Sequence, residues 1–393
     1  MIKILMLTAG VVIAGAVLLV LAGRAASSTL TRDQAAAKIR AILSAVVRKN
    51  KNITGALVLV DTGPAGVRQT FTAGTVHGRP MKPDQPFHVA SVGKSFTAAL
   101  VGIMADEGWL NLDDPVDTYL PPPLLEGLFT VGGVDYSKEV TIAQLLNHTS
   151  GVADYFYGPV IQGTPLIKQM LSAPDRFWTP ADLVEYTRVQ QKPAGKPREK
   201  YSYSDTGYIL LGLLLEKVSG KTFHELLHER IFTPLGMDDS YLLFYSNPVN
   251  KTRPLAEVWL NKEDLSRRTS LSIDWAGGGI VSTLFDLEKF IKVFARGEVV
   301  KPETRKRLWT FDQKFRPGIH YGLGFMEFHF GEFFPTLKSF PVLKGHMGVL
   351  GTQMLYDEAT GTVYIAGFGS ASYSAGSVRT MIKILATARR VGG

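Results

Sequence analysis

Predicted strands lie at both ends of this chain, and predicted helices fill its middle. An amphipathic helix begins at Thr31, and two β-prone runs follow within residues 53–74. Further β-prone runs lie within residues 321–368, ahead of a terminal helix near residues 377–389. This order favours an α+β fold with one antiparallel sheet built from both ends of the chain. N- and C-terminal helices would flank the sheet, and a large, mostly helical domain would be inserted between its strands.

The N-terminus carries an export pattern. Lys3 precedes an uncharged run over residues 4–23, and Arg24 and small residues follow it. A helix of about 20 apolar residues can span a bilayer, and this run has that length. We therefore expect residues 1–28 to be a signal peptide or an N-terminal membrane anchor. The protein would then be exported, either to the periplasm or to the membrane surface.

The 393-residue chain has the composition of a globular protein, with 45% hydrophobic residues, 20% charged residues and no cysteine. The lack of cysteine excludes a disulfide scaffold, a thiolate nucleophile and a cysteine-based zinc site. The formal net charge is +8, but the lysines and arginines form no dominant block. We therefore expect a solvated basic surface, suited to anionic lipid or cell-wall polymer, and no nucleic-acid partner.

A hydroxyl and an amine lie three residues apart where an apolar helical pattern begins, at Ser91 and Lys94. Residues at this spacing share one face of a helix. The free N–H groups of a helix N-terminus favour a developing anion and oppose protonation of a nearby amine. A neutral Lys94 can take the proton from Ser91 and make it a nucleophile. The alternative interpretation is a capping serine beside a solvated lysine.

Two histidine motifs lend themselves to other chemistry. His148 follows a short predicted helix and is either a base or a side chain that closes the helix end by hydrogen bonds, and we adopt the second interpretation. The segment His224-Glu225-x-x-His228 matches the zinc-protease pattern. Its apolar residues also fit a core-facing helix, and no obvious third ligand follows. A zinc metallohydrolase is therefore kept as a minor alternative, and we expect no metal or cofactor.

Three short motifs together resemble those of one enzyme family. In chain order they are Ser91-x-x-Lys94, Tyr203-x-Asp205 and His346-x-Gly348. This order resembles the penicillin-recognising serine hydrolases, and most closely the branch of class C β-lactamases, D-alanyl-D-alanine carboxypeptidases and related esterases. Residues 108–121 and 145–151 look like further family landmarks. The resemblance therefore covers nearly all of the chain after residue 30.

The resemblance implies a role for each site residue. Ser91 would attack the acyl carbonyl and form an acyl-enzyme, with Lys94 assisting as base. Tyr203 would relay the proton to the leaving group and help activate water for deacylation. The N–H groups of Ser91 and Val349 would form the oxyanion hole. Gly348 would let the substrate backbone lie close to the strand edge.

Two departures from the family pattern bear on the substrate. Asp205 stands where many relatives have asparagine, and a carboxylate there favours the ammonium form of Lys94 and suits a substrate that carries an amine. His346 stands where lysine is common in β-lactamases, and histidine is a weaker anchor for a substrate carboxylate at neutral pH. Lys94 and His346 would also supply the cationic neighbours that Tyr203 needs to ionise. Both departures argue against an efficient β-lactamase.

The resemblance implies a β-lactamase/transpeptidase-like serine hydrolase domain over residues 30–393. Its α/β part would comprise about residues 30–90 and 315–393, and its helical part about residues 91–314. We expect a serine hydrolase that acts on a small peptide or ester, D-alanyl-D-alanine carboxypeptidase-like or β-lactamase-related, with cell-wall peptide as one candidate substrate. A carboxylesterase of the same fold and a catalytically silent binding protein on this scaffold are the alternatives.

Overall fold

The computed structural model describes residues 29–64, 66–250 and 253–391. The predicted signal peptide or anchor over residues 1–28 lies outside these residues. Among the helices within them, none has the length and apolar character needed to cross a membrane.

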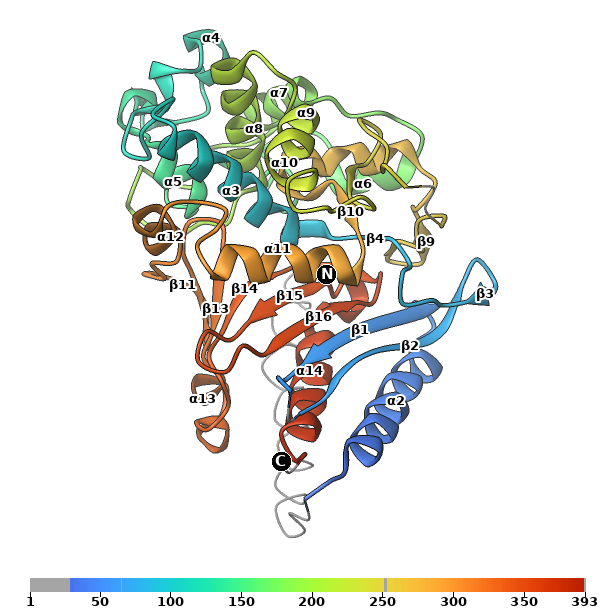
Figure 1. Cartoon of the computed structure of the whole chain (residues 1–393). Coiled ribbons are helices and arrows are strands. Elements are labelled where there is room, and N and C mark those ends of the chain that lie inside the picture. The colour runs from blue at the N-terminus through green and yellow to red at the C-terminus, as the bar shows by residue number, and fades with distance from the viewer. Residues whose placement is uncertain (1–28, 65, 251–252, 392–393) are drawn as a thin grey trace.

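A nine-stranded antiparallel sheet forms one half of the molecule (Figure 1). Its strand order is β11-β12-β13-β14-β15-β16-β1-β2-β3, so the two ends of the chain meet where β16 pairs with β1. This arrangement confirms the predicted α+β fold with one sheet built from both chain ends. The strands are β1 (Gly55–Asp61), β2 (Arg68–Val76), β3 (Arg79–Pro80), β11 (Gln313–Arg316), β12 (Ile319–Tyr321), β13 (Met326–Phe328), β14 (Leu343–Met347), β15 (Gln353–Tyr356) and β16 (Val363–Gly367).

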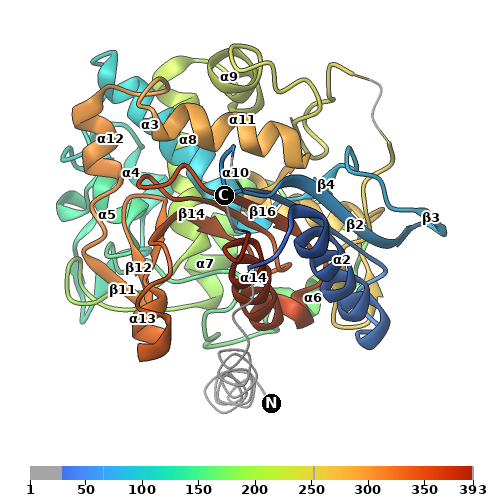
Figure 2. The same cartoon turned by 60° about the horizontal axis from the view of Figure 1, so that its bottom comes forward.

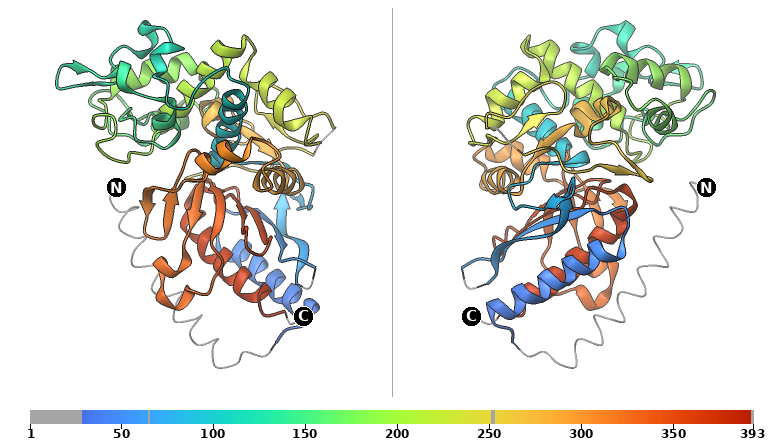
Figure 3. Two further views of the ribbon diagram at one scale, coloured as in Figure 1. Left: turned by 60° about the vertical axis from the view of Figure 1, so that its left-hand side comes forward. Right: turned by 90° about the vertical axis from the view of Figure 1, so that its right-hand side faces the viewer.

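The central strands are buried on both faces of the sheet. Successive side chains of a strand point to opposite faces. Ala56 and Val58 of β1 therefore pack with α2 (Arg32–Lys49) and α14 (Ser374–Ala388), which lie side by side on one face (Figures 2 and 3). Leu57 and Leu59 pack toward α11 (Leu284–Ala295) and the helical half of the molecule. A capping box is present at the start of α2, where Thr31 and Gln34 bond each other reciprocally, and it agrees with the predicted helix start at Thr31.

The helical half lies above the sheet in Figure 1 and is organised around α3 (Gly93–Asp106) and α8 (Asp205–Ser219), which contact each other. Every residue of α3 from Gly93 to Gly102 is buried. The other helices of this half are α4 (Pro122–Leu125), α5 (Ile142–Leu146), α6 (Leu166–Ser172), α7 (Pro180–Gln190), α9 (Phe223–Leu227), α10 (Trp275–Gly278) and α12 (Pro302–Leu308). A short helix, α13 (Phe330–Phe333), lies beside the sheet.

Short strands join the two halves of the molecule. A three-stranded sheet is formed by β4 (Phe87–His88), β10 (Ile280–Ser282) and β7 (Tyr241–Leu242). Two further pairs are β5 (Thr130–Val131) with β6 (Val134–Asp135), and β8 (Trp259–Leu260) with β9 (Glu263–Asp264). The chain leaves β4 directly into the segment that carries Ser91.

Two segments depart in detail from what their sequence patterns indicate. The β-prone run over residues 321–328 forms two strands, because Gly324 turns the chain between them with a φ of +80° and packs against α3. The core-facing helix that carries His224 and His228 is regular only as α9, and a wider π-helical turn follows over His228–Phe232.

Candidate active site

Ser91 and Lys94 lie at a turn from strand to helix. Ser91 belongs to a short 3₁₀ turn, Ala90–Val92, and Lys94 lies in the first turn of α3. The Nζ atom of Lys94 is 3.5 Å from the Oγ atom of Ser91. Ser91 is half-buried, whereas the side chain of Lys94 is fully buried. Ala90 has a φ of +50°, which is uncommon for a residue other than glycine, and this turn presents Ser91 to the site.

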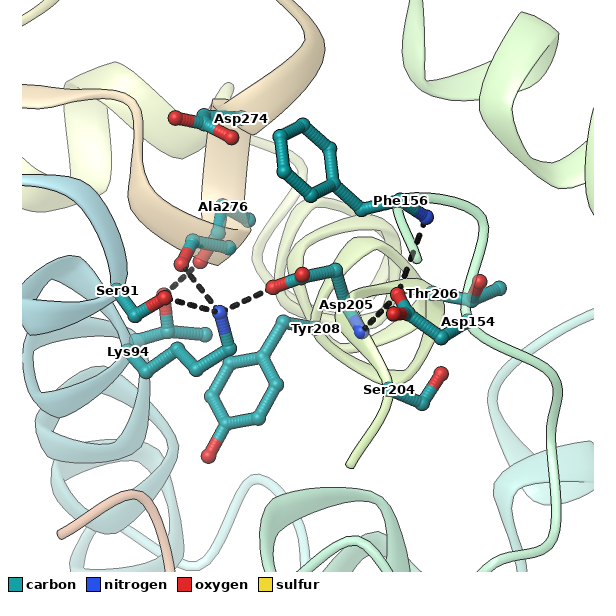
Figure 4. Close-up of polar contacts among 12 residues, drawn as sticks. Ser91, Lys94, Asp154, Phe156, Ser204, Asp205, Thr206, Tyr208, Asp274 and Ala276 are labelled. Carbon is teal, nitrogen blue, oxygen red and sulfur yellow. Dashed lines mark hydrogen bonds and ion pairs between the residues drawn. The ribbon is translucent and has the colours of Figure 1, made fainter. Parts of the chain in front are cut away.

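The amine of Lys94 has three polar partners. It contacts Ser91, donates to the carboxylate of Asp205, and donates to the carbonyl oxygen of Gly277 at 2.7 Å (Figure 4). A lysine ammonium group has three N–H donors, and this arrangement uses all of them. The predicted neighbour relation between Asp205 and Lys94 is therefore a direct ion pair.

Tyr203 lies in the loop that leads into α8, beside Ser91 and Lys94. Its side chain hydrogen-bonds Ser91, and the Nζ atom of Lys94 lies 5.1 Å from the centroid of its ring. Burial and then the charge of Asp205 raise the pKa of Tyr203 well above its usual range, and the bond to Ser91 offsets only part of this rise. Tyr203 therefore stays protonated, and the expected ionisation by cationic neighbours is wrong.

His346 is fully buried on β14 and both of its ring nitrogens have protein partners. Nδ1 donates to the carbonyl oxygen of Met347 at 2.7 Å, and Nε2 accepts from the hydroxyl of Tyr321 at 3.0 Å. Burial, followed by the charge of Lys94, lowers the pKa of His346 to about 3. The ring is therefore neutral at neutral pH. The expectation that it supplies positive charge to Tyr203 is wrong, and the neutral ring agrees with the expectation that it is a weak anchor for a substrate carboxylate.

The absence of a side chain at Gly348 lets two segments of the protein pack closely against each other. A side-chain Cβ atom at this position would lie 2.2 Å from the Oγ1 atom of Thr352 and 2.8 Å from the carbonyl oxygen of Val89. The missing side chain therefore lets the end of β14 pack against the turn that carries Ser91. Val349, the predicted second oxyanion-hole residue, follows immediately and is half-buried.

A sequence model of the Beta-lactamase family matches residues 27–380 of the chain. The chain belongs to the Beta-lactamase family. This confirms both the resemblance inferred from the motifs and the β-lactamase/transpeptidase-like fold.

Individual members of the Beta-lactamase family are similar to this chain over different lengths. Penicillin-binding protein 4* of Bacillus subtilis (strain 168) is 32% identical over 41% of this chain and 32% of its own length. Penicillin-binding protein 4 of Amycolatopsis lactamdurans is 32% identical over 50% of this chain and 47% of its own length. The chain thus spans less than half the length of either relative. A solved D-stereospecific amidohydrolase from Streptomyces sp. has a TM-score of 0.72 and 26% identity, over 88% of this chain and 97% of its own.

Two further carboxyl groups border this Beta-lactamase-family site. Asp154 accepts from the backbone N–H of Asp205 at 3.1 Å, and Asp274 lies 3.6 Å from the buried Nε2 atom of His88 (Figure 4 shows both carboxyl groups). Burial, followed by the charge of Asp205, raises the pKa of Asp154 and that of Asp274 to about 7. Burial also lowers the pKa of His88 to about 4, so this histidine is neutral. Asp154 and Asp274 therefore hold their protons up to about pH 7, and the negative charge in contact with Lys94 is that of Asp205.

Four residues that support the site carry no sequence signal for that role. Asp154 and Asp274 lie in stretches without periodicity, so no pattern marks them. Tyr208 belongs to the apolar run of α8 and Tyr321 to a β-prone run, and both patterns indicate core residues. In the structure the hydroxyl of Tyr208 donates to the carbonyl of Leu146 at 2.8 Å and lies 3.5 Å from that of Tyr321.

The residues of the zinc-protease pattern make hydrogen bonds in and around α9. Glu225 accepts from the backbone N–H of Thr222 at 2.8 Å and completes a capping box. The Nε2 atom of His228 lies 3.1 Å from the hydroxyl of Ser246, and that of His224 lies 3.3 Å from the hydroxyl of Thr222. Among the described residues no group of three histidine or carboxylate side chains is placed to hold a metal ion.

Proposed function

We propose that this chain is a serine hydrolase that forms an acyl-enzyme on Ser91. One observation carries the proposal: the Oγ atom of Ser91 lies 3.5 Å from the amine of a fully buried lysine, at the start of a helix. Tyr203 hydrogen-bonds the same hydroxyl. Membership of the Beta-lactamase family supports the same chemistry.

In the proposed reaction, Lys94 first passes a proton to the carboxylate of Asp205, which it contacts directly. Ser91 Oγ then bonds the acyl carbon while its own proton passes to the neutral amine of Lys94. The N–H groups of Ser91 and Val349 stabilise the negative charge that develops on the carbonyl oxygen. Protonated Tyr203 gives its proton to the leaving amine or alkoxide and regains one from Lys94. The bond to the leaving group breaks, and water later releases the acyl group by the reverse sequence.

We propose a small amide or short peptide with a free amino group as the substrate, with the D-alanyl peptides of cell walls as the leading class. The carboxylate of Asp205 favours a positively charged substrate, and the neutral ring of His346 provides no cation for the carboxylate of a β-lactam. The name of the Streptomyces relative, a D-stereospecific amidohydrolase, points to the same class. A carboxylesterase is the second candidate, because the uncharged His346 also suits an ester without a carboxylate.

The N-terminal export pattern supports a site of action outside the cytoplasm. We propose that residues 1–28 direct the protein to the periplasm or tether it to the membrane, where cell-wall peptides are available. Cell fractionation of the full chain tests this proposal, and recovery in the cytoplasmic fraction would contradict it.

A turnover panel tests the proposed activity. Purified protein is assayed with a D-amino acid amide, a D-alanyl-D-alanine peptide, a p-nitrophenyl ester and a cephalosporin. We expect turnover of the amide or peptide, slow cephalosporin hydrolysis, and loss of all turnover in Ser91→Ala. Ser95→Ala is the matched control, since Ser95 lies one turn further along α3 and its hydroxyl donates to the carbonyl oxygen of Gly324 at 2.9 Å. Full activity in Ser91→Ala would contradict the proposal, and turnover of the ester alone would favour the esterase.

A further inference from the structure

His148 is a buried residue with an unusual backbone conformation, and the proposed mechanism does not use it. Its φ is +61°, in the left-handed region that residues other than glycine and asparagine rarely adopt. Its side chain was expected to close the end of α5, but that expectation is wrong. The helix ends on the backbone N–H of Asn147, which bonds the carbonyl of Ala143, and the ring of His148 points to another segment.

His148 holds the chain on both sides of Tyr203. Its carbonyl oxygen accepts from the backbone N–H of Ser202 at 2.8 Å. Its Nδ1 atom accepts from the backbone N–H of Ser204 at 3.1 Å. These two bonds clamp the residue before and the residue after Tyr203. His148, the residue in the left-handed conformation, therefore makes one of these bonds through its main chain and the other through its side chain.

The ring of His148 also supports the ring of Tyr203. The two ring centroids are 4.1 Å apart at an interplanar angle of 32°. Tyr208 and Tyr321 contact the other sides of the imidazole, with centroids at 5.4 Å and 4.6 Å. His148 is only 1% exposed, so it lies behind Tyr203 and away from solvent.

The imidazole is fixed in one neutral form. Because Nδ1 accepts a hydrogen bond from Ser204, the ring proton lies on Nε2. Burial and then the charge of Lys94 lower the pKa of His148 well below its usual range. A neutral, buried ring with this tautomer is suited to holding a neighbour and not to exchanging protons with a substrate.

We propose that His148 is a positioning residue that holds the hydroxyl of Tyr203 in line for proton transfer to the leaving group. The inference rests on the proposed acyl-transfer function. A general acid works only within hydrogen-bond reach of its target, and a shift of about 1 Å can cost on the order of 100-fold in rate. Three contacts from one residue, two to the main chain and one to the ring, fix that position.

The leaving group separates this role from a general loss of folding. An amine must be protonated as it leaves, whereas p-nitrophenolate leaves without a proton. We expect His148→Ala to lower kcat/KM for the D-amino acid amide by about 100-fold, in the range of general acid catalysis, and for the p-nitrophenyl ester by less than about 5-fold. Equal losses on both substrates would overturn the proposal.

Two conservative variants test which contact matters. Asparagine tolerates a positive φ and offers a side-chain oxygen to the N–H of Ser204, so His148→Asn should recover part of the amide activity. His148→Phe keeps a ring against Tyr203 but lacks the acceptor, so it should recover less. His148→Asn also serves if His148→Ala fails to fold. No recovery in His148→Asn, although it melts at the wild-type temperature, would contradict the role of the Nδ1 bond.

His77 provides a matched control. It also has a positive φ, of +46°, and its Nε2 atom bonds the carbonyl of Leu255 at 2.9 Å, in the turn between β2 and β3. His77→Ala should change amide and ester turnover by the same small factor.

A double variant tests whether His148 acts through Tyr203. The variant His148→Ala/Tyr203→Phe should be no slower on the amide than Tyr203→Phe alone, because both changes remove the same proton transfer to the leaving group. Independent, multiplied losses would overturn the proposal.

A crystallographic comparison tests the position of Tyr203 independently of the proposed function. If the wild-type protein turned over neither substrate, the proposed function would fail. Structures of the wild-type protein and of His148→Ala would still decide the positional claim. We expect the hydroxyl of Tyr203 to move by about 1 Å or more away from Ser91 in the variant. An unmoved Tyr203 would contradict the positioning role whatever the activity.

Discussion

At the residue scale, the contact between Lys94 and Asp205 distinguishes this site. The carboxylate bonds the same amine that contacts Ser91. Asp205 thus places a negative charge next to the proposed base. The charge holds the amine in place, and under the proposed function it favours a substrate with a free amino group.

Asp205→Asn should therefore change substrate preference more than folding. Asparagine has nearly the same shape and keeps one acceptor for Lys94, but it removes the negative charge. We expect turnover of substrates with a free amino group to fall about 10-fold relative to turnover of a neutral ester, a change of about 1.4 kcal/mol in differential transition-state binding. Rates over the substrate panel and a melting curve measure this. Asp175→Asn, at an exposed surface carboxylate, is the control, and an unchanged ratio for Asp205→Asn would contradict a role for the charge.

Gly348 sets how closely β14 approaches the turn that carries Ser91. The Cβ atom of Gly348→Ala would overlap Thr352 and Val89, so the strand or the turn must move. We expect a loss of stability of about 1–3 kcal/mol and a fall in acylation rate of about 100-fold. Chemical denaturation and pre-steady-state labelling measure the two effects. Gly331→Ala, which meets only the side chain and Cα atom of Lys338 within 3.2 Å, should leave the acylation rate unchanged.

At the element scale, the loop before Tyr155 is tied to the first turn of α8 through Asp154. Its carboxyl group accepts from the backbone N–H groups of Asp205 and Phe156, at 3.1 Å and 3.2 Å. Burial and the neighbouring charge of Asp205 raise its pKa to about 7 from an ordinary value of 3.8. Ionisation of Asp154 is therefore less favourable in the folded state than in the unfolded state, so it destabilises the folded protein.

The stability of the protein should accordingly depend on the protonation of Asp154. Between pH 4 and pH 7 the folded state holds a proton that the unfolded state has lost, so this group makes stability fall as pH rises through that window. Asp154→Asn removes the ionisation. We expect the drop in melting temperature between pH 5 and pH 8 to be smaller in the variant by a few degrees. Scanning calorimetry at both pH values measures it, and an equal or larger drop in Asp154→Asn would contradict the assignment.

The elements also show what sequence patterns predict and what they cannot. The start of α3 was predicted because apolar spacing and the Ser91–Lys94 pair occur together in a short stretch. The left-handed conformation of His148 could not be predicted, because it depends on bonds to Ser202 and Ser204 more than fifty positions away. The neutrality of His346 depends in the same way on burial against Tyr321, which local sequence does not encode.

At the scale of the whole molecule, the site lies where three distant segments meet. Ser91 and Lys94 come from the start of α3, Tyr203 and Asp205 from the start of α8, and Gly348 from the end of β14. The sheet was predictable from its alternating and β-prone runs at both chain ends. The carboxyl groups of the site were not, since Asp154 and Asp274 come close to Asp205 only when the helical half packs together.

The central claim is that Ser91 is the nucleophile, and mass spectrometry of the intact protein tests it most directly. Wild-type protein, Ser91→Ala and Ser95→Ala are incubated with a fluorophosphonate and with a fluorescent penicillin, and the modified peptide is sequenced. The account predicts one added group on wild-type protein and on Ser95→Ala, mapped to Ser91, and none on Ser91→Ala. Equal labelling of Ser91→Ala, or no labelling of any of the three by either probe, would contradict it.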